Sequence, residues 1–351
     1  MIMVGVMAAT LWGIGIAMKA PYHARWTMLA ILLVGVMMLH VVLPAGHPLR
    51  EATGGDARLW ALFIAFGFIV WGYRRFLGGL RARIAEKETP VARSGTFSDT
   101  ELERYARHII LREVGGPGQK ALRDAKVLVV GAGGLGAPVL EYLAAAGVGT
   151  IGVIDDDVVE NANLQRQVIH LDRNIGMPKV HSAAEAMRAQ NPFVTVRPYQ
   201  RRLDEDIAAD LFADYDLILD GTDNFDTRYL VNRTAVALGK PLIAAALTQW
   251  EGQISLYDPA HGTPCYECVF PTAPDAALVP NCAEAGVIGP LPGVIGAMMA
   301  VEALKVITGA GDGLGGRLLI YDALYAQTRT IAVKPRADCA VCGGRGLQAK
   351  G

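Results

Sequence analysis

The sequence predicts an α/β protein built on a doubly wound, Rossmann-like sheet and preceded by transmembrane helices. A β-branched run, Lys126–Val130, ends at the glycine-rich loop Gly131–Gly136, and helical residues Ala137–Ala146 follow. A second β-branched run, Thr150–Ile154, completes a strand–loop–helix–strand unit. Such a unit forms a parallel, right-handed crossover. The membrane part is indicated by three apolar runs in the first ninety residues.

Composition sets the limits of the function. The chain has 351 residues with a net charge of −1, which argues against a general nucleic-acid binder. Its mean hydropathy of +0.29 is high for a soluble enzyme, and the excess lies near the N-terminus. A length of this size allows a large catalytic domain with an added segment.

The apolar runs are Ile2–Met18, Trp26–Leu43 and Leu59–Tyr73, and none contains Asp, Glu, Lys or Arg. A membrane span needs about 20 residues, with a range of 17–25. The first two runs reach the short end of this range and the third is marginal. A secretory signal is one alternative, although no basic residue precedes Lys19. A soluble helical hairpin is the other alternative.

Flanking charges predict the orientation of this segment. Lys19 and Arg25 follow the first run, and four arginines between residues 74 and 83 follow the third. The positive-inside rule places the catalytic domain on the cytoplasmic side of the inner membrane. We predict a membrane region of about three transmembrane helices at 1–77, a linker at 78–97 and a catalytic domain at 98–346.

Further elements follow in order along the catalytic domain. Ser98–Glu101 has the form of a capping box and predicts a helix to about Leu111, which Gly115–Gly118 would break. Later strands are predicted at Leu217–Leu219, Pro241–Ala246, Gln253–Tyr257 and Leu318–Tyr321. A long apolar helix at Leu291–Thr308 would stop at Gly309.

The glycine loop predicts a nucleotide site. A loop between strand and helix presents backbone N–H groups and a helix N-terminus to an anion. Asp155 ends the next strand, where a carboxylate binds a ribose hydroxyl. NAD and ATP are both compatible with these features. The pattern G-x-x-x-x-G-K-[ST] is absent, which argues against a P-loop ATPase.

Cations near the loop favour chemistry at a phosphate. Asn163, Arg166 and Lys179 follow the Asp155 strand, and a hydride-transfer site has little use for them. Arg and Lys both bind phosphate. Asp223 follows another predicted strand and could hold Mg²⁺. The alternative is that Arg166 and Lys179 form surface ion pairs with acids at 156, 157 or 160.

These motifs together resemble the MoeB/ThiF/HesA adenylyltransferases, bacterial relatives of the ubiquitin-activating enzymes. The resemblance covers roughly residues 98–345 and rests on Gly131–Gly136, Asp155–Asp157, Asn163–Gln167, Gly176–Lys179 and Asp223–Asn224. It implies adenylation of the C-terminal Gly-Gly carboxylate of a small ubiquitin-like sulfur carrier with ATP and Mg²⁺, releasing pyrophosphate.

The residues suit that reaction. A C-terminal carboxylate with a pKa of about 3.5 is already ionised and needs no general base. The barrier is the approach of one anion to another, so catalysis depends on positioning and on cations. The expected catalytic groups are Arg166, Lys179 and Asp223 with Mg²⁺. The expected nucleotide-binding residues are Gly133, Gly134, Asp155, Asn163, Leu164, Gln165, Arg166, Lys179, Asp223 and Asn224.

The resemblance also implies a role for Arg107. Its local sequence is compatible with a solvated helix face. In the family, the matching arginine reaches across a homodimer into the partner's ATP site. The expectation is therefore a homodimer with Arg107 acting in trans.

Four cysteines form two C-x-x-C pairs, Cys265/Cys268 and Cys339/Cys342. Four thiolates make a closed, structural Zn²⁺ site. Chance pairing and redox use are the alternatives, and the resemblance implies that zinc pins the C-terminal tail. The remaining Cys282 is either a nucleophile that takes the acyl group or an idle small hydrophobe.

Several functions share this chemistry. A membrane-tethered enzyme acting on the molybdopterin synthase small subunit is our first expectation. A ThiF-like role with the thiamine sulfur carrier is the alternative, as is a relative acting on tRNA or a peptide. A non-enzymatic membrane scaffold is disfavoured by the intact cation set. No rhodanese-like domain is appended, so we expect a separate sulfur donor such as a cysteine desulfurase or rhodanese.

Overall fold

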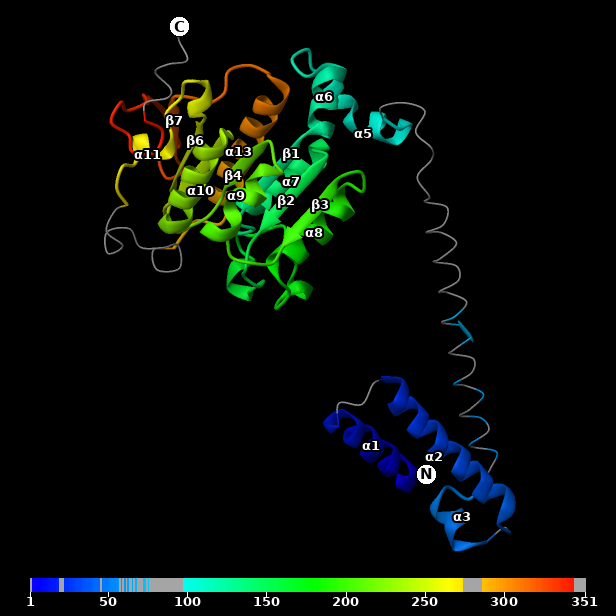
Figure 1. Cartoon of the computed structure of the whole chain (residues 1–351). Helices are drawn as coiled ribbons and strands as arrows, with labels where there is room; N and C mark the ends of the chain where they lie inside the picture. The colour runs from blue at the N-terminus through cyan, green and yellow to red at the C-terminus, as the bar shows by residue number, and fades with distance from the viewer. Residues whose placement is uncertain are drawn as a thin grey trace. The chain divides into compact units, whose positions relative to one another are not determined.

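A computed structural model describes residues 2–18, 22–44, 46–56, 97–273 and 286–343, together with some positions between 58 and 75 (Figure 1). The chain divides into two compact units, Met1–Arg93 and Ser94–Gly351. Each unit is described separately below. The predicted linker at 78–97 lies almost wholly outside the described residues.

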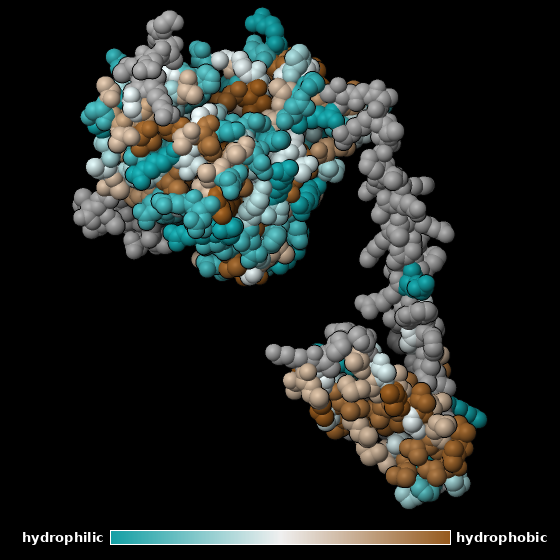
Figure 2. Space-filling model, in the orientation of Figure 1, coloured by the Kyte–Doolittle hydropathy of each residue, from teal (hydrophilic) through white to brown (hydrophobic). Residues whose placement is uncertain are grey.

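The N-terminal unit consists of α1 (Ile2–Ala17), α2 (Tyr22–Val42) and the short α3 (Pro48–Ala52). Its small core contains Val4, Val36 and Trp60. The outer faces remain apolar, with Ile31 67% and Val34 63% exposed (Figure 2). Most of the third apolar run lies outside the described residues, and its described positions are helical.

Two described helices are long and apolar enough to cross a membrane, Ala24–Val42 within α2 and Pro290–Thr308. The first is 11% buried and the second 44%. The second helix, α13, packs in the core of the catalytic unit through Ile295, Met299 and Ala303. Burial therefore distinguishes an ordinary core helix from α2, whose apolar surface has no protein partner of comparable extent within the described part.

The second unit contains one eight-stranded sheet in the order β3-β2-β1-β4-β5-β6-β7-β8 (Figure 1). Pairings from β3 to β5 are parallel, and those from β5 to β8 are antiparallel. This confirms the predicted doubly wound sheet and adds an antiparallel half. The strands are β1 Lys126–Val130, β2 Thr150–Ile154, β3 Thr195–Tyr199, β4 Leu217–Asp220, β5 Leu242–Leu247, β6 Glu251–Tyr257, β7 Arg317–Asp322 and β8 Gln327–Ala332.

Helices cover both faces of the parallel half. Alternate residues of β1, such as Val127 and Val129, pack in one core cluster with side chains of α7, α8 and α13. Their neighbours Leu128 and Val130 pack in a second cluster with α9 and α10. This period of two is the strand pattern of a sheet buried on both sides. The helices are α7 Gly136–Ala146, α8 Lys179–Gln190, α9 Glu205–Ala213, α10 Phe225–Leu238 and α13 Pro290–Thr308.

Two helices precede the sheet. α5 (Asp99–Ile109) begins with the predicted capping box, in which Ser98 and Glu101 bond each other's backbone N–H. The predicted break is present, because α5 ends at Ile109, but the glycines also begin another helix. They form the first turn of α6 (Gly115–Asp124), since Gly115 takes a left-handed φ of 58° and a new helix starts there.

Short elements complete the unit. They are the 3₁₀ turns η1 Asn161–Asn163, η2 Asp172–Asn174 and η3 Pro259–His261, and the one-turn helix α11 Tyr266–Val269.

Candidate active site

Loops that follow β1 and β4 meet at the carboxyl edge of the sheet. Gly131 has a φ of 95°, and a side chain there would lie 3.3 Å from the Gly221 oxygen. A Cβ on Gly136 would lie only 2.0 Å from the Gly131 oxygen, so only glycine fits. β1 is flanked by β2 on one side and β4 on the other, which is the switch point where such sheets bind ligands.

Asp155 connects β2 to the glycine loop. Its Oδ2 accepts the Ala132 N–H at 2.7 Å and its Oδ1 accepts the Asp157 N–H at 2.8 Å. Burial raises the pKa of Asp155 above its ordinary value, while these N–H groups act in the opposite direction. The carboxylate expected to bind a ribose thus also holds the loop in place.

Lys179 is paired within the protein. Its side chain is 6% exposed, and Nζ lies 2.7 Å from Asp157 Oδ2. The alternative of an ion pair with a neighbouring acid is therefore correct for Lys179. The pair is not an ordinary surface one, because the lysine is buried while the carboxylate is 67% exposed. Lys179 also lies near enough to Asp155 to lower the pKa of that carboxyl.

Arg166 is held next to the loop by local contacts. Its guanidinium donates to the Ala162 oxygen at 3.0 Å and to Asn163 Oδ1 at 3.2 Å. Within the described residues no carboxylate pairs with it, so its charge is uncompensated at the site edge. A Cβ on Gly134 would lie 4.0 Å from Arg166 Cδ. The same Cβ would lie 3.2 Å from Pro292, so Gly134 also permits close packing on α13.

The remaining residues of the 163–167 segment line the same loop. Leu164 is partly exposed and Gln165 is exposed, with Gln165 packed against Gly289 ahead of α13. Gln167 is buried, and no hydrogen-bond partner for its Oε1 is found in the described ranges. Its Nε2 would lie 3.7 Å from a Cβ on Gly133. Sequence reasoning did not single out Gln167 for a role of its own, because nothing local distinguishes it from an ordinary polar residue.

Backbone donors complete the cradle. Within the described part of the chain, no partner is found for the N–H groups of Gly133 and Gly134. Free N–H groups beside a buried, unpaired amide oxygen and two cations fit an anionic, hydrogen-bonding ligand. The residues present therefore fit a nucleotide.

Beyond β4, the structure separates two neighbouring acids. Asp223 is exposed, as a metal-binding carboxylate requires, and Asn224 caps α10 by accepting the Thr227 N–H at 2.9 Å. Asp220 is 1% exposed and lies 3.7 Å from the buried Arg228. This buried pair shapes the loop and was missed from sequence, although its position at a strand end was the available signal.

The described residues do not bring Arg107 or Cys282 to this constellation. Arg107 is exposed in the last turn of α5, and no hydrogen bond or ion pair joins it to the loop within the described single chain. Cys282 lies in 274–285, outside the described residues.

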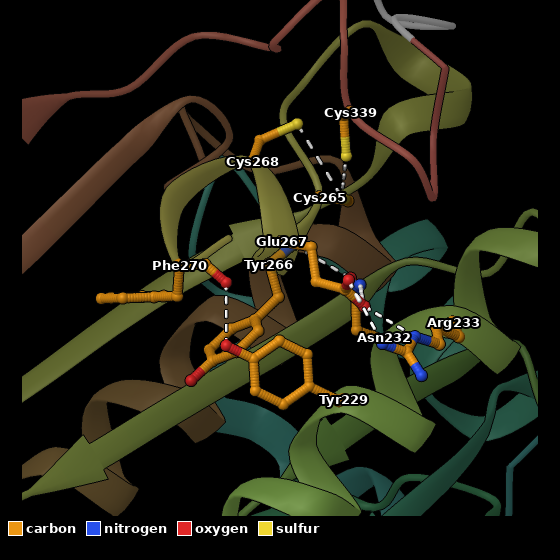
Figure 3. Close-up of polar contacts among 9 residues, drawn as sticks. All are labelled: Tyr229, Asn232, Arg233, Cys265, Tyr266, Glu267, Cys268, Phe270 and Cys339. Carbon is orange, nitrogen blue, oxygen red and sulfur yellow. Dashed lines mark hydrogen bonds and ion pairs between the residues drawn. The ribbon is translucent and has the colours of Figure 1, made fainter. Parts of the chain in front are cut away.

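The four cysteines converge in a second, separate site, and Figure 3 shows three of them, Cys265, Cys268 and Cys339. The Sγ–Sγ distances are 3.8 Å for Cys265/Cys268, 3.6 Å for Cys265/Cys339 and 3.5 Å for Cys268/Cys342. A tetrahedral site with metal–sulfur bonds of about 2.3 Å has sulfur–sulfur edges of about 3.8 Å. The geometry and the donor set therefore suit a metal ion.

Electrostatics agrees with this reading. Burial, and then the charge of Cys268, raise the pKa of the Cys265 thiol. Burial acts the same way on Cys339, but backbone N–H groups of Cys342 and Val341 bring the pKa of that thiol below its ordinary value. A cation would allow all four thiols to ionise together.

The cysteine cluster is anchored on α10 (Figure 3). Arg233 Nε donates to Glu267 Oε1 at 3.0 Å, and the Asn232 side chain accepts the Tyr266 N–H at 2.9 Å. The Tyr229 hydroxyl donates to the Phe270 oxygen at 2.9 Å. One helix thus begins at the nucleotide loops and ends against the cysteine cluster.

Comparison with known proteins agrees with this geometry. The ThiF family model matches residues 105–341. A sulfur carrier protein adenylyltransferase of Thermus thermophilus is 50% identical over 256 residues, covering 72% of this chain and 94% of that protein. The SAMP-activating enzyme E1 of Haloferax volcanii is 48% identical over 248 residues, covering 71% and 91%.

Longer relatives and solved structures extend the comparison. The probable adenylyltransferase/sulfurtransferase MoeZ of Mycobacterium tuberculosis is 50% identical over 244 residues, which cover 69% of this chain and 62% of that protein. A crystal structure of E. coli MccB with MccA-N7isoASN has a TM-score of 0.60 at 25% identity, covering 68% and 74%. The chain belongs to the ThiF family and is an adenylyltransferase.

Proposed function

We propose that the protein uses ATP and Mg²⁺ to adenylate the C-terminal Gly-Gly carboxylate of a small ubiquitin-like sulfur carrier. The observation that carries the proposal is the glycine-loop edge, where the N–H groups of Gly133 and Gly134 have no partner among the described residues. Arg166 lies beside Gly134, and Lys179 lies near Asp155. The names of the Thermus and Haloferax relatives support this class of substrate.

The reaction needs no proton transfer from the acceptor. A carboxylate oxygen attacks the α-phosphorus of ATP, a P–O bond to the pyrophosphate breaks, and pyrophosphate leaves with its electron pair. Arg166 and Lys179 would offset the negative charge that accumulates, and Asp223 would hold Mg²⁺, which neutralises phosphate oxygens when bound. Asp155 would orient the nucleotide through its ribose.

A small pocket lies beside the loop that follows β4. It is lined in part by Arg228, Gln253 and Phe270, and three consecutive alanines of β5, Ala244–Ala246, form one wall. Arg228 also contacts Asp220 and donates to the Thr222 oxygen, so the pocket adjoins the nucleotide edge.

The cysteine cluster is proposed to hold Zn²⁺ as a structural ion. The four thiols leave no ligand position for water, which a catalytic zinc would require. Zinc there would fasten Cys339 and Cys342, near the C-terminal end of the described chain, to the α11 turn.

We further propose a homodimer in which Arg107 acts on the partner's site. Its exposure and its position away from any described carboxylate partner support this role. Mixing an Arg107→Ala subunit with an Asp223→Ala subunit should restore one working site per heterodimer, measured as ATP–pyrophosphate exchange. Two inactive subunits that recover nothing would contradict action in trans.

The N-terminal unit is proposed to hold the enzyme at the inner membrane, with the catalytic unit facing the cytoplasm. The exposed apolar surface of α2 supports this placement, and the ThiF match begins only at residue 105. Carbonate-washed membranes should retain the full chain and release a variant lacking residues 1–77. Equal release of both would contradict a membrane anchor.

The most suitable carrier is the molybdopterin synthase small subunit, and the thiamine sulfur carrier is the alternative. A tRNA or peptide substrate is a further alternative, and solved MccB structures contain MccA. Cys282 as acyl acceptor and a separate sulfur donor, a cysteine desulfurase or rhodanese, would serve the step after adenylation.

ATP–pyrophosphate exchange with purified carriers separates these substrates. We expect exchange that depends on the molybdopterin synthase small subunit and disappears when its two C-terminal glycines are deleted. Exchange with the thiamine sulfur carrier alone would show that this carrier, and not the molybdopterin synthase small subunit, is the substrate. Absence of exchange with both carriers would contradict the proposed substrate class.

A further inference from the structure

Two side chains, the partly buried Asp155 and the buried His170, hold the Ala132 peptide groups of the glycine loop. The Ala132 N–H donates to Asp155 Oδ2 at 2.7 Å, and the Ala132 oxygen accepts from His170 Nε2 at 3.0 Å. His170 is 4% exposed and comes from the loop after η1. The proposed adenylation reaction assigns no role to this histidine, although it contacts the glycine loop.

A chain of hydrogen bonds fixes the protonation of this imidazole. The carbonyl of Ala132 can only accept, so Nε2 carries the hydrogen. Asn174 Nδ2 donates to Ser182 Oγ at 2.9 Å, and Ser182 Oγ lies 2.9 Å from His170 Nδ1. In the neutral Nε2–H tautomer, Nδ1 is an acceptor, and the Ser182 hydroxyl can donate to it while its oxygen accepts from Asn174. Asn174 and Ser182 are themselves buried, at 5% and 0% exposure.

Peptide planarity carries this constraint to the next residue. The Ala132 carbonyl and the Gly133 N–H belong to the same trans peptide, so they point in opposite directions. Because His170 holds the carbonyl on the core side, the Gly133 N–H is turned away from the core. That N–H has no partner within the described residues, and the space beside Gly133 is bordered only by Gln167 within 4 Å.

We infer that His170 is a positioning residue that aims the Gly133 N–H at a phosphate oxygen of the bound nucleotide. The inference rests on the proposed use of ATP and adds a residue that never touches the substrate. Removing the Nε2 donor frees the peptide to rotate, so the N–H loses its fixed direction. Contacts to the ribose and base do not pass through this peptide.

Charge and burial favour the same tautomer. Burial lowers the pKa of His170, and nearby Lys179 lowers it further, while the Ala132 carbonyl and Asp155 act in the opposite direction. Asp157 also faces this region, but it is paired with Lys179. Protonation would place a hydrogen on Nδ1 and leave the Ser182 hydroxyl without its acceptor.

The effect of pH on stability has a definite sign. Since the folded pKa lies below the ordinary value of about 6.5, the unfolded chain binds this proton first as pH falls. The contribution of His170 is complete above about pH 6.5 and is lost as pH falls toward the folded pKa.

The test compares ATP with adenosine. All variants are made in the full-length protein. His170→Phe removes the Nε2–H donor, and His170→Gln retains an amide N–H that can replace it. Ser182→Ala removes the hydroxyl beside Nδ1, so the ring is no longer held in one tautomer. Loss of one hydrogen bond corresponds to about a tenfold effect on binding. We expect His170→Phe to weaken Mg·ATP binding about tenfold and to leave adenosine binding unchanged. His170→Gln should recover most of the affinity, and Ser182→Ala should lie between wild type and His170→Phe.

Kinetics gives a second, independent readout. His170→Phe should raise the KM for ATP in pyrophosphate exchange and leave the KM for the carrier unchanged. Equal loss of ATP and adenosine binding in folded variants, or wild-type ATP affinity in His170→Phe, would overturn the inference. If His170→Phe does not fold, Ser182→Ala provides the test. A Ser182→Ala variant that binds ATP as tightly as wild type would overturn the inference. A wild-type protein that binds ATP but exchanges with no carrier would contradict only the proposed substrate.

Discussion

The two ends of α10 differ in how the protein satisfies its own polar groups. Near its N-terminus, the N–H groups of Gly133 and Gly134 and the Gln167 Oε1 have no partner among the described residues. At its C-terminal half, the cysteine cluster is enclosed, with the four sulfur atoms in mutual contact and fixed by Asn232 and Arg233. The open end indicates a site for substrates, and the closed end indicates a structural site.

The strongest test of the closed end removes a metal ligand. Cys342→Ser should lower the free energy of unfolding by about 4 kcal/mol or more, because loss of a structural metal is among the largest single-residue effects. Metal content and denaturant unfolding measure this. Asp338→Asn is the matched control, since that side chain is 76% exposed, and it should be nearly neutral. If metal-free Cys342→Ser were as stable as wild type, the cysteine cluster would not be a structural metal site.

The open end should show the reverse pattern. Asp223→Ala should reduce pyrophosphate exchange by about 10²–10³-fold, the size expected for losing charge stabilisation in the transition state. Its melting temperature should stay near that of wild type, because the side chain is exposed. Asp226→Ala, an exposed acid in the first turn of α10, serves as control. Comparable loss of activity in both variants would show that Asp223 has no special role.

The smallest expected effect on stability comes from the Arg233–Glu267 ion pair, which joins α10 to α11 beside the cysteine cluster. The Arg233 side chain is 61% exposed, so its ion pair with Glu267 is worth about 0.2–1 kcal/mol. Arg233→Ala should therefore lower stability slightly and leave the KM for ATP unchanged. A change of several fold in the KM for ATP would show that α10 couples the two sites. The cysteine cluster would then affect nucleotide binding and would not be purely structural.

Sequence reasoning succeeded where burial and backbone rules dominate. The apolar runs of β1 and β2 were located to the residue, because a strand covered on both faces is almost continuously hydrophobic. It missed β3, which carries Arg197 and Pro198 at a sheet edge, and β8, whose residues are all exposed. Edge strands have no hydrophobic alternation to detect.

The site was predicted in part for similar reasons. Charged and glycine residues at characteristic spacing located the loop, Arg166 and Lys179. The contact of His170 with Ala132 spans 38 positions and depends on tertiary packing, so no local pattern could reveal it. The buried Asp220–Arg228 pair was also missed, although the position of Asp220 at the end of β4 was a signal.

The glycine-loop edge is proposed to activate the carrier carboxylate, whereas the cysteine cluster is proposed only to stabilise the fold. Mass spectrometry of the carrier after incubation with the full-length protein and Mg·ATP tests this proposal directly. We expect a carrier–AMP adduct at the terminal carboxylate, formed by wild type and by the Asp226→Ala control and absent with Asp223→Ala. A carrier that stays unmodified with the folded, zinc-loaded wild-type protein, or that is adenylated equally by Asp223→Ala, would contradict it.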